Sequence, residues 1–423
     1  MYAEAKQVEA ESNVKMREEP RQNFLFLLLD LGLMMAASNF ASTVTVVPAF
    51  LKQLTQSKLI IGLIPSVATL GGGLIQILVA NYTRQLDRKK RFVVLVTAGE
   101  RLPYLVFAAM AMFYAHISVE WFLTLFLLLI MINNLAMGIG APPWLDIISE
   151  SVSRKRRGRF FGYSNLLASS LGVAFSLAGG YLLETHGFPS GYALCFLSAF
   201  LVTVIAWIFL CLIKEPSYPR IEQNVRFRHY IYQLPSILRR DRDFSLFIAS
   251  STVIMGFSTA AGAFYTVHAI DTLDLTGGQI GALTAMLLTA QTVSTILWGQ
   301  LGDEKGHKLV IALGACCSLL ATFLITVAST IIIFYGAFLL AGAASSAGMV
   351  SNMSIVLEFS PPEETETYFG LANAIRAPFL FITPLLGGAL ADAYQCQSVF
   401  VLSMVMLPIG LTLLLFVKDP RSR

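Results

Sequence analysis

Charged side chains are scarce in this chain of 423 residues, because Asp, Glu, Lys and Arg together make up only 13% of it. Soluble globular proteins carry about 25%, so the composition argues against a soluble domain. The sequence also lacks a nucleophile elbow, a P-loop, a dinucleotide-binding glycine run and a cluster of metal ligands. These absences disfavour an enzyme and an ATP-driven pump, and they predict no metal and no other cofactor.

Cysteine offers no redox or metal framework either. There are five cysteines, an odd number, with no CxxC pair and no Cys/His spacing typical of zinc sites. The five histidines are scattered along the chain. We therefore interpret the cysteines as small apolar packing residues.

What the chain has in abundance is apolar sequence: 56% of its residues are hydrophobic and its mean hydropathy is +0.68. Apolar runs of about 20 residues are long enough to cross a bilayer as helices, and such runs recur along almost the whole length. The sequence thus predicts an all-α membrane protein with twelve transmembrane helices. The expected spans are 23–50, 59–82, 92–115, 119–146, 158–184, 190–213, 244–268, 277–300, 308–329, 331–356, 366–391 and 396–417.

A long internal repeat relates the two halves of the chain. The stretch Gly140–Glu184 reappears without a gap at Gly348–Asp392, at an offset of 348 − 140 = 208 residues. Duplicated membrane units are typical of transporters, whose similar halves move around a site between them. We expect two pseudo-symmetric six-helix bundles. The expected organisation is a tail at 1–22, one bundle at 23–213, a linker with an amphipathic helix at 214–243, a second bundle at 244–417 and a tail at 418–423.

Lys and Arg cluster on the tails and on every second loop of the twelve-span arrangement, whereas the other loops carry only Lys52 and Lys58. This asymmetry predicts that both termini are cytoplasmic and that the protein lies in the plasma (inner) membrane. A signal peptide is not expected, because no short apolar core with a cleavage site precedes the first full span. The net charge of +4 requires no nucleic-acid partner, since basic loops also contact anionic lipid.

One loop carries a family resemblance. The segment Gly299-Gln-Leu-Gly-Asp-Glu-Lys-Gly-His-Lys308 resembles the signature G-x-L-A/G-D-x-x-G-x-R/K of the major facilitator superfamily, whereas the matching loop 81–91 lacks both glycines. The resemblance implies twelve helices, alternating access and a charged latch on the cytoplasmic side. The residues expected at this cytoplasmic gate are Gly299, Asp303, Gly306, Lys308, Glu150, Glu358 and Arg157. We expect Lys308 and Lys305 to meet carboxylates such as Glu358. The alternative is that these groups only fix the topology and solvate a loop.

Four ionisable residues fall inside predicted spans, where charge is costly and commonly functional: Asp30, Glu100, Arg101 and Arg376. Desolvation favours the neutral form of a carboxylate, so Asp30 is the candidate proton carrier. Arg376 has the apolar Ala168 as its repeat mate and is the candidate contact for an anionic substrate, or else a gate residue paired with a loop acid. We expect Glu100 and Arg101 to form a structural cluster in which Arg101 neutralises Asp30. Adjacent helical residues do not face each other, so we do not expect Glu100 and Arg101 to pair.

Uncharged polar residues within the spans either line a cavity or bridge helices by hydrogen bonds, and the sequence leaves both possibilities open. These candidates are Asn39, Ser42, Asn133, Asn134, Asn165, Tyr265, Gln291, Asn352 and Asn373.

Together these features predict a secondary active transporter that moves a small organic molecule by alternating access, with proton coupling, efflux and a monomeric state as the preferred details. One alternative is an uptake carrier of the same fold for a nutrient or a lipid. Another is a membrane receptor or scaffold that has lost transport. The sequence names no substrate.

Overall fold

The computed structural model describes residues 21–69, 79, 82–83, 86, 88–215, 237–361 and 364–422, and the regular elements in these ranges are all helices. The N-terminal tail up to residue 20, most of the predicted amphipathic linker, most of 70–81 and the loop residues Arg84 and Asp87 lie outside the described residues. The elements are α2 (Arg21–Ala37), η2 (Ser38–Ala41), α3 (Val46–Leu54), α4 (Lys58–Ala68), α6 (Lys89–Met112), η4 (Tyr114–His116), α7 (Val119–Ser151), α8 (Arg154–His186), α9 (Ser190–Leu212), α11 (Arg242–Leu273), α12 (Gly277–Lys305), α13 (His307–Val327), α14 (Ile331–Phe359), α15 (Thr365–Leu415) and η5 (Pro420–Ser422).

Ten helical segments of the described chain are long and apolar enough to cross a bilayer. One of them, α15, holds two of the predicted spans, because Tyr394 and Gln395 leave the helical conformation between them. The predicted second span begins with α4, which is apolar but short within the described residues. The structure therefore agrees with the predicted twelve-helix, all-α architecture.

The first predicted span departs from the expected continuous helix. It breaks at η2, and Ser42 that follows has a φ of −52° and a ψ of 120°. Two polar side chains here bond to the backbone of α2: the Ser38 hydroxyl donates to the Met35 carbonyl at 2.8 Å, and the Asn39 amide donates to the Ala36 carbonyl at 3.1 Å. Such local bonds compete with helix continuation, which explains why the chain restarts only at α3.

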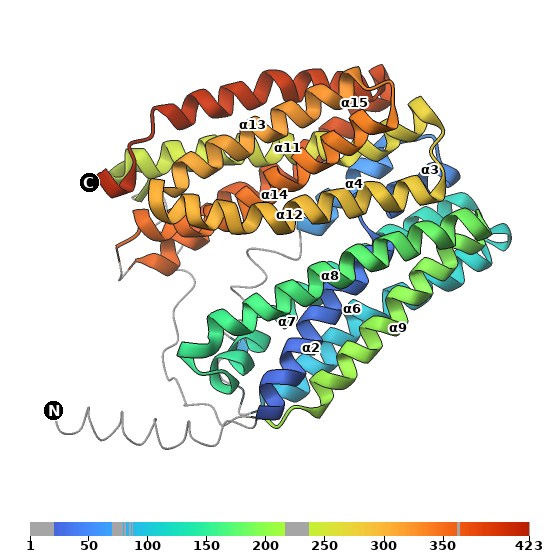
Figure 1. Ribbon diagram of the computed structural model, residues 1–423, viewed down its shortest axis with the longest axis horizontal. Coiled ribbons are helices and arrows are strands. Elements are labelled where there is room, and N and C mark those ends of the chain that lie inside the picture. The colour runs from blue at the N-terminus through green and yellow to red at the C-terminus, as the bar shows by residue number, and fades with distance from the viewer. Residues whose placement is uncertain are drawn as a thin grey trace.

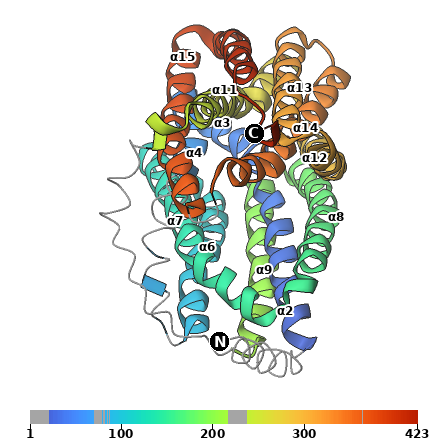
Figure 2. The ribbon, with the colours of Figure 1, turned by 90° about the vertical axis from the view of Figure 1, so that its left-hand side faces the viewer.

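The helices form two groups (Figure 1). In one, α2, α6, α7, α8 and α9 lie together, and in the other α11, α12, α13, α14 and α15 do. Between them, α4 packs against α15, α3 packs against α11, and α8 runs along α12. Figure 2 shows the same two groups end-on, with α8 beside α12 on one flank.

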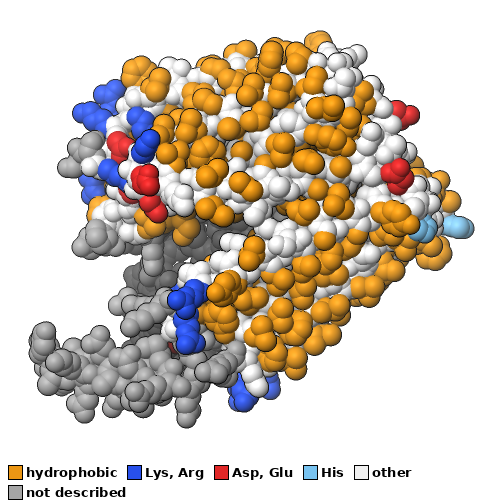
Figure 3. Space-filling model, in the orientation of Figure 1, with side chains coloured by type: hydrophobic (Ala, Val, Ile, Leu, Met, Phe, Trp, Pro, Cys, Tyr) orange, Lys and Arg blue, Asp and Glu red, His pale blue; other side chains and the backbone are white. Residues whose placement is uncertain are grey.

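We call the end at which α2 begins and α15 ends the termini side, and the opposite end the far side. The termini side is on the left in Figure 1. In Figure 3, apolar side chains cover the visible face between these ends, while Lys, Arg, Asp and Glu gather mainly at the termini side, with a few at the far side. A belt of apolar surface between polar ends is what a bilayer-spanning protein needs.

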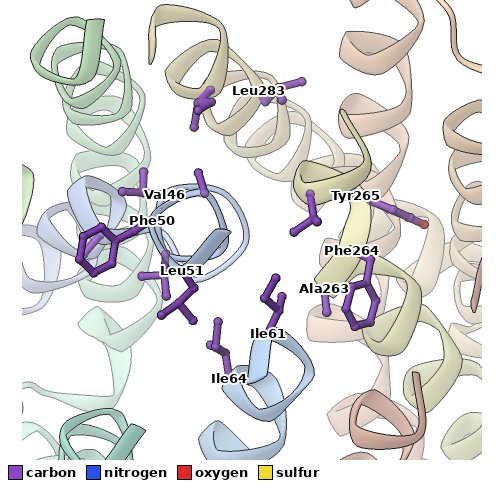
Figure 4. Packing of buried hydrophobic residues seen from close by; sticks show 14 of the residues in the cluster. Val46, Phe50, Leu51, Ile61, Ile64, Ala263, Phe264, Tyr265 and Leu283 are labelled. Carbon is purple, nitrogen blue, oxygen red and sulfur yellow. The ribbon is translucent and has the colours of Figure 1, made fainter. Parts of the chain in front are cut away.

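An apolar core crosses between the two groups near the far side. Side chains from α3 and α4, including Phe50 and Ile61, belong to the same buried cluster as Phe264 and Leu283 from α11 and α12, and Figure 4 shows these residues around a common centre. Phe50 is fully buried, and its ring lies 5.1 Å from that of Tyr192 between centroids. The Phe50–Tyr192 contact joins α3 to α9, and the shared cluster joins α3 and α4 to α11 and α12 at the far side.

Candidate functional site

A cavity of about 670 Å³ lies between the second group of helices and the α3–α4 region of the first half of the chain. Its wall comes from α4 and the region around α3 on one side, and from α11, α12, α13 and α14 on the other. Most lining side chains are apolar, interspersed with hydroxyls, and none of them is charged. The polar lining residues are Thr43, Ser251, Ser258, Thr259, Tyr265, Ser318, Ser345 and Asn352.

A second, smaller chamber of about 250 Å³ adjoins the first at the break in the first span. The two chambers share Thr43, Val44, Leu287 and Ser345 as lining residues. Irregular backbone at membrane depth is tolerated where it lines a cavity, and discontinuous helices mark binding sites in several transporter folds. The small chamber is the more polar of the two, with Ser38, Asn39, Ser42, Thr45, Thr284 and Gln291 in its wall.

The structure brings several of the predicted polar residues to this cavity. Asn39, Ser42 and Gln291 line the small chamber, while Tyr265 and Asn352 line the large one. The Tyr265 hydroxyl also makes a 2.7 Å hydrogen bond with the Thr322 hydroxyl, which fixes the ring against α13.

Four other predicted residues line neither chamber. The Asn133 amide donates to the Glu100 carbonyl at 2.5 Å and so bridges α7 to α6, and the Asn134 amide donates to the Ile130 carbonyl of its own helix at 2.9 Å. Asn165 and Asn373, the repeat-related pair, are exposed. In this conformation Asn133 bridges two helices, Asn134 bonds within its own helix, and Asn165 and Asn373 are exposed.

Asp30 lies in a buried charge cluster between α2 and α6 rather than in the cavity wall. One of its carboxylate oxygens is 3.4 Å from the Arg101 guanidinium, and the other accepts a 3.1 Å hydrogen bond from the Trp144 indole. The guanidinium also donates to the Thr203 carbonyl at 3.1 Å and to the Thr97 carbonyl at 2.5 Å. The structure thus makes the contact between Arg101 and Asp30 that the sequence suggested.

The expectation that Glu100 and Arg101 stay apart is wrong. The Arg101 Nη1 atom is 3.6 Å from the Glu100 carboxylate. The reason is the length of the arginine side chain, which folds back over its own helix to reach the Thr97 carbonyl one turn earlier. The side chains of Asp30, Glu100 and Arg101 are all at least nine-tenths buried, so this buried cluster holds two carboxylates for one guanidinium.

Arg376 lies on α15 behind the wall of the large chamber. One guanidinium nitrogen donates to the Ser251 hydroxyl at 2.8 Å, and Ser251 itself lines the chamber. The guanidinium carbon lies 5.4 Å from the centre of the Phe247 ring. Only 7% of Arg376 is exposed, its Nε has no hydrogen-bond partner, and no ion pair joins it to an acid among the described residues.

The residues expected at the cytoplasmic gate lie at the termini side. Glu358 pairs with Arg421 at 2.7 Å, whereas Lys308 donates to the Val417 carbonyl at 2.5 Å. The expected contact between Lys308 and Glu358 is therefore absent from the described hydrogen bonds and ion pairs, because the C-terminal segment inserts its own arginine and carbonyl groups.

The other termini-side residues also bond within their own half. The guanidinium of Arg157 donates to the carbonyls of Ser149 and Val152, and the Asp303 carbonyl accepts from Arg421 at 2.8 Å. Glu150 is exposed. Gly306 lies at the turn between α12 and α13 with a φ of +95° that side chains rarely allow, whereas Gly299 lies within α12, where an added Cβ would meet nothing within 4 Å.

Sequence reasoning missed Thr43, Leu287 and Ser345 at the junction of the chambers, and Trp144 and Arg421 as partners of charged groups. For Thr43 a signal was present, since it belongs to the polar group Ser38, Asn39, Ser42 and Thr43 within an otherwise apolar run. Several polar residues so close together in an apolar run favour a break in the helix. Trp144 and Arg421 carry no local signal, because their partners lie far away along the chain.

Comparison with known proteins gives the chain a family. It matches the Major Facilitator Superfamily over residues 29–269 and 246–423. It is 27% identical over 144 residues to a tetracycline resistance protein, class H, from Pasteurella multocida, a match that covers 34% of this chain and 36% of that relative. The aligned stretch thus spans little more than a third of that protein.

Solved structures resemble it over nearly the full length. A nucleoside transporter, NupG, superimposes with a TM-score of 0.72 at 13% identity, covering 94% of this chain and all of the other. A D-xylose-proton symporter gives a TM-score of 0.71 at 13% identity, covering 95% and 99%. These likenesses show a shared fold. With its apolar helices and the cavity between its halves, the chain is an integral membrane transporter and belongs to the Major Facilitator Superfamily.

Proposed function

We propose that this transporter exports a small, largely apolar organic molecule from the cytoplasm by alternating access, driven by protons. The observation that supports the substrate class most directly is the cavity itself. A chamber of about 670 Å³ with an uncharged wall suits a drug-sized apolar body. The adjoining polar chamber provides hydroxyl and amide groups for one hydrogen-bonding end of the molecule.

Alternating access is supported by how the halves meet. In the described residues, the hydrogen bonds between halves lie at the far side or around the cavity, for example from the Thr266 hydroxyl to the Val44 carbonyl at 2.8 Å. On the termini side, Figure 3 shows a hollow between the two groups of helices. We propose that this side faces the cytoplasm, in the plasma membrane, and that the residues around Asp303 and Glu358 approach the other half when the cavity opens outward.

For proton coupling we propose the buried charge cluster. Two carboxylates, Asp30 and Glu100, share the single guanidinium of Arg101, and an unneutralised buried charge is costly. A proton on either carboxylate leaves one acid for one base. The cluster is built on α2 and α6, and α2 leads directly into the broken segment at the small chamber. Protonation of Asp30 or Glu100 can therefore shift α2 and, through it, the broken segment that lines the small chamber.

We further propose that Arg376 sets the charge preference of the large chamber. Its buried positive charge lies directly behind Ser251, which belongs to the chamber wall. No acid is paired with it in the described part of the chain. A substrate with an acidic group on its apolar body would find compensation there. Export is supported by the similarity to a tetracycline resistance protein, because resistance fits removal of the drug from the cell.

Counterflow in proteoliposomes tests the proposal. Purified protein should exchange a labelled apolar amphiphile against the same unlabelled compound, and an imposed proton gradient should drive net movement. An uptake carrier would show the opposite net direction for the same gradient. A receptor or scaffold would bind a partner saturably and show no counterflow. The absence of counterflow for a set of apolar amphiphiles would refute the transport proposal.

A further inference from the structure

At the far side, two carboxylates make hydrogen bonds that cross between the halves. Near the end of the first helical run of α15, Asp392 accepts hydrogen bonds from the beginning of α4. The donors are the Ser57 hydroxyl at 2.9 Å, the Lys58 backbone N–H at 2.5 Å and the Leu59 backbone N–H at 3.1 Å. Helix N-termini favour anions because their first N–H groups have no partner within the helix.

Glu184 makes the same kind of contact between the other two helices that meet there. At the end of α8, its carboxylate accepts from the Thr276 hydroxyl at 3.2 Å and from the Gly278 backbone N–H at 2.7 Å, both at the start of α12. The backbones approach closely here, since a Cβ added to Gly277 would lie 2.6 Å from the Leu183 carbonyl carbon.

The two contacts are equivalent by the internal symmetry of the chain. The acids are repeat mates, because 392 − 184 = 208. The helices that they cap align on Gly62 and Gly281, at an offset of 281 − 62 = 219. At this same offset the two hydroxyl donors correspond, and so do the two N–H donors. The corresponding pairs are Ser57 with Thr276 and Leu59 with Gly278.

We infer that Glu184 and Asp392 are gate residues of the transport cycle, which hold the far side shut while the cavity is open at the termini side. Each bond joins a helix of one half to a helix of the other, so both must break for the far side to open. These hydrogen bonds lie in exposed positions, where polar contacts are individually weak, so they can be broken in each cycle.

Labelling of one cavity position measures this gate without any substrate. Thr43 lines both chambers and its side chain is accessible there, so Thr43→Cys is the reporter, in a variant whose five native cysteines are replaced by serine. A membrane-impermeant maleimide is applied to intact cells and to inside-out vesicles. The inference rests on the proposed alternating access, and labelling from the termini side tests that part separately.

Glu184→Ala and Asp392→Ala should each raise the rate of far-side labelling about two- to fivefold, the usual effect of losing a helix cap. The two effects should multiply in the double variant, because the sites share no partner. Glu184→Gln and Asp392→Asn, which keep one acceptor oxygen and the side-chain shape, should fall between these values and the parent. The matched control is Glu120→Ala at the start of α7, an exposed acid on the same side, which should change nothing.

Unchanged far-side labelling in the double variant, with normal labelling from the termini side, would overturn the gate and leave the cavity proposal standing. An equal increase in the Glu120 control would overturn it as well, because the effect would then be one of surface charge. A parent protein that is labelled from neither side would overturn both the gate and alternating access.

Discussion

Arg376 and the buried charge cluster differ in how their charge is compensated. Arg376 has one hydrogen bond and an aromatic face, whereas Arg101 contacts two carboxylates and two carbonyls. An unpaired buried charge is energetically unfavourable, so its presence in a span indicates a functional role. Function at Arg376 should therefore be visible in the binding of charged ligands, and function at the cluster should be visible in the response to pH gradients.

Replacing Arg376 by Lys should weaken binding of a carboxylate-bearing substrate, since Lys keeps the charge and loses the planar donor fork. Arg376→Ala should weaken it more, on the order of 10-fold or above for the loss of a charged hydrogen bond. The measurement is the apparent affinity in counterflow for an acidic compound and for its neutral ester. Equal changes for both compounds, or none for either, would contradict the role of the charge.

In the charge cluster, Asp30→Asn leaves one acid for one base and so removes the need for a proton. We expect transport driven by a pH gradient to be lost in this variant while counterflow continues. Glu100→Gln should behave in the same way. Arg101→Ala should instead destabilise the protein by about 3–5 kcal/mol, because two buried carboxylates would lose their partner. If the Asp30→Asn variant still transported at the parent rate under a pH gradient, the cluster would be structural only.

At the residue scale, sequence pattern singled out the buried charged residues, and five of its nine uncharged polar candidates line the cavity. It could not separate Asn39 and Gln291, which line the small chamber, from Asn133, which binds the backbone of α6. All three are amides in apolar runs, and an apolar run shows no clear polar face from which the direction of a side chain could be read. The partners Trp144 and Arg421 depend on tertiary packing, which a single sequence does not encode locally.

At the scale of elements, the close crossing of α8 and α12 depends on glycine. A Cβ on Gly281 would lie 2.6 Å from the Ser176 carbonyl oxygen and 2.7 Å from the Gly180 Cα atom. Small residues permit such approaches between membrane helices. Gly180 lies within the internal repeat, with Gly388 as its mate, but the repeat does not show which helices these glycines bring together.

Gly281→Ala should therefore push α12 away from α8, at a cost of about 1–3 kcal/mol for overpacking. The readout is the midpoint of thermal unfolding of the purified protein in detergent, which should fall. Gly336→Ala on α14 is the control, because a Cβ there would meet nothing within 4 Å and alanine favours a helix. If the two variants unfolded at the same temperature, the close crossing would not contribute to stability.

At the scale of the whole molecule, the twelve-helix fold could be predicted because apolar runs, short hairpins and a long repeat are strong, local signals. The break in the first span was not predicted, because an apolar run of that length favours one helix. The polar group at Ser38, Asn39, Ser42 and Thr43 was a signal in the sequence, but the competing backbone bonds of Ser38 and Asn39 become visible only in the structure.

The orientation in the membrane gives a prediction for the entire chain. With the termini side in the cytoplasm, a cysteine at Glu120 should react with an impermeant maleimide on intact cells, and a cysteine at Arg156 should react only in inside-out vesicles. Both positions are exposed. Reaction of the Arg156 variant on intact cells would show that the orientation is the opposite of the one proposed.

The ion pair between Lys52 and Asp271 at the far side has an implication for the origin of the chain. These residues are themselves mates, because 271 − 52 = 219, so they face each other across the pseudo-symmetry axis. In a true dimer of two identical halves, a residue on the axis would face its own copy, and like charges there would repel. Opposite charges at this point require that the two halves have diverged in sequence. Lys52 and Asp271 thus show that the two halves of this chain are no longer interchangeable at their common axis.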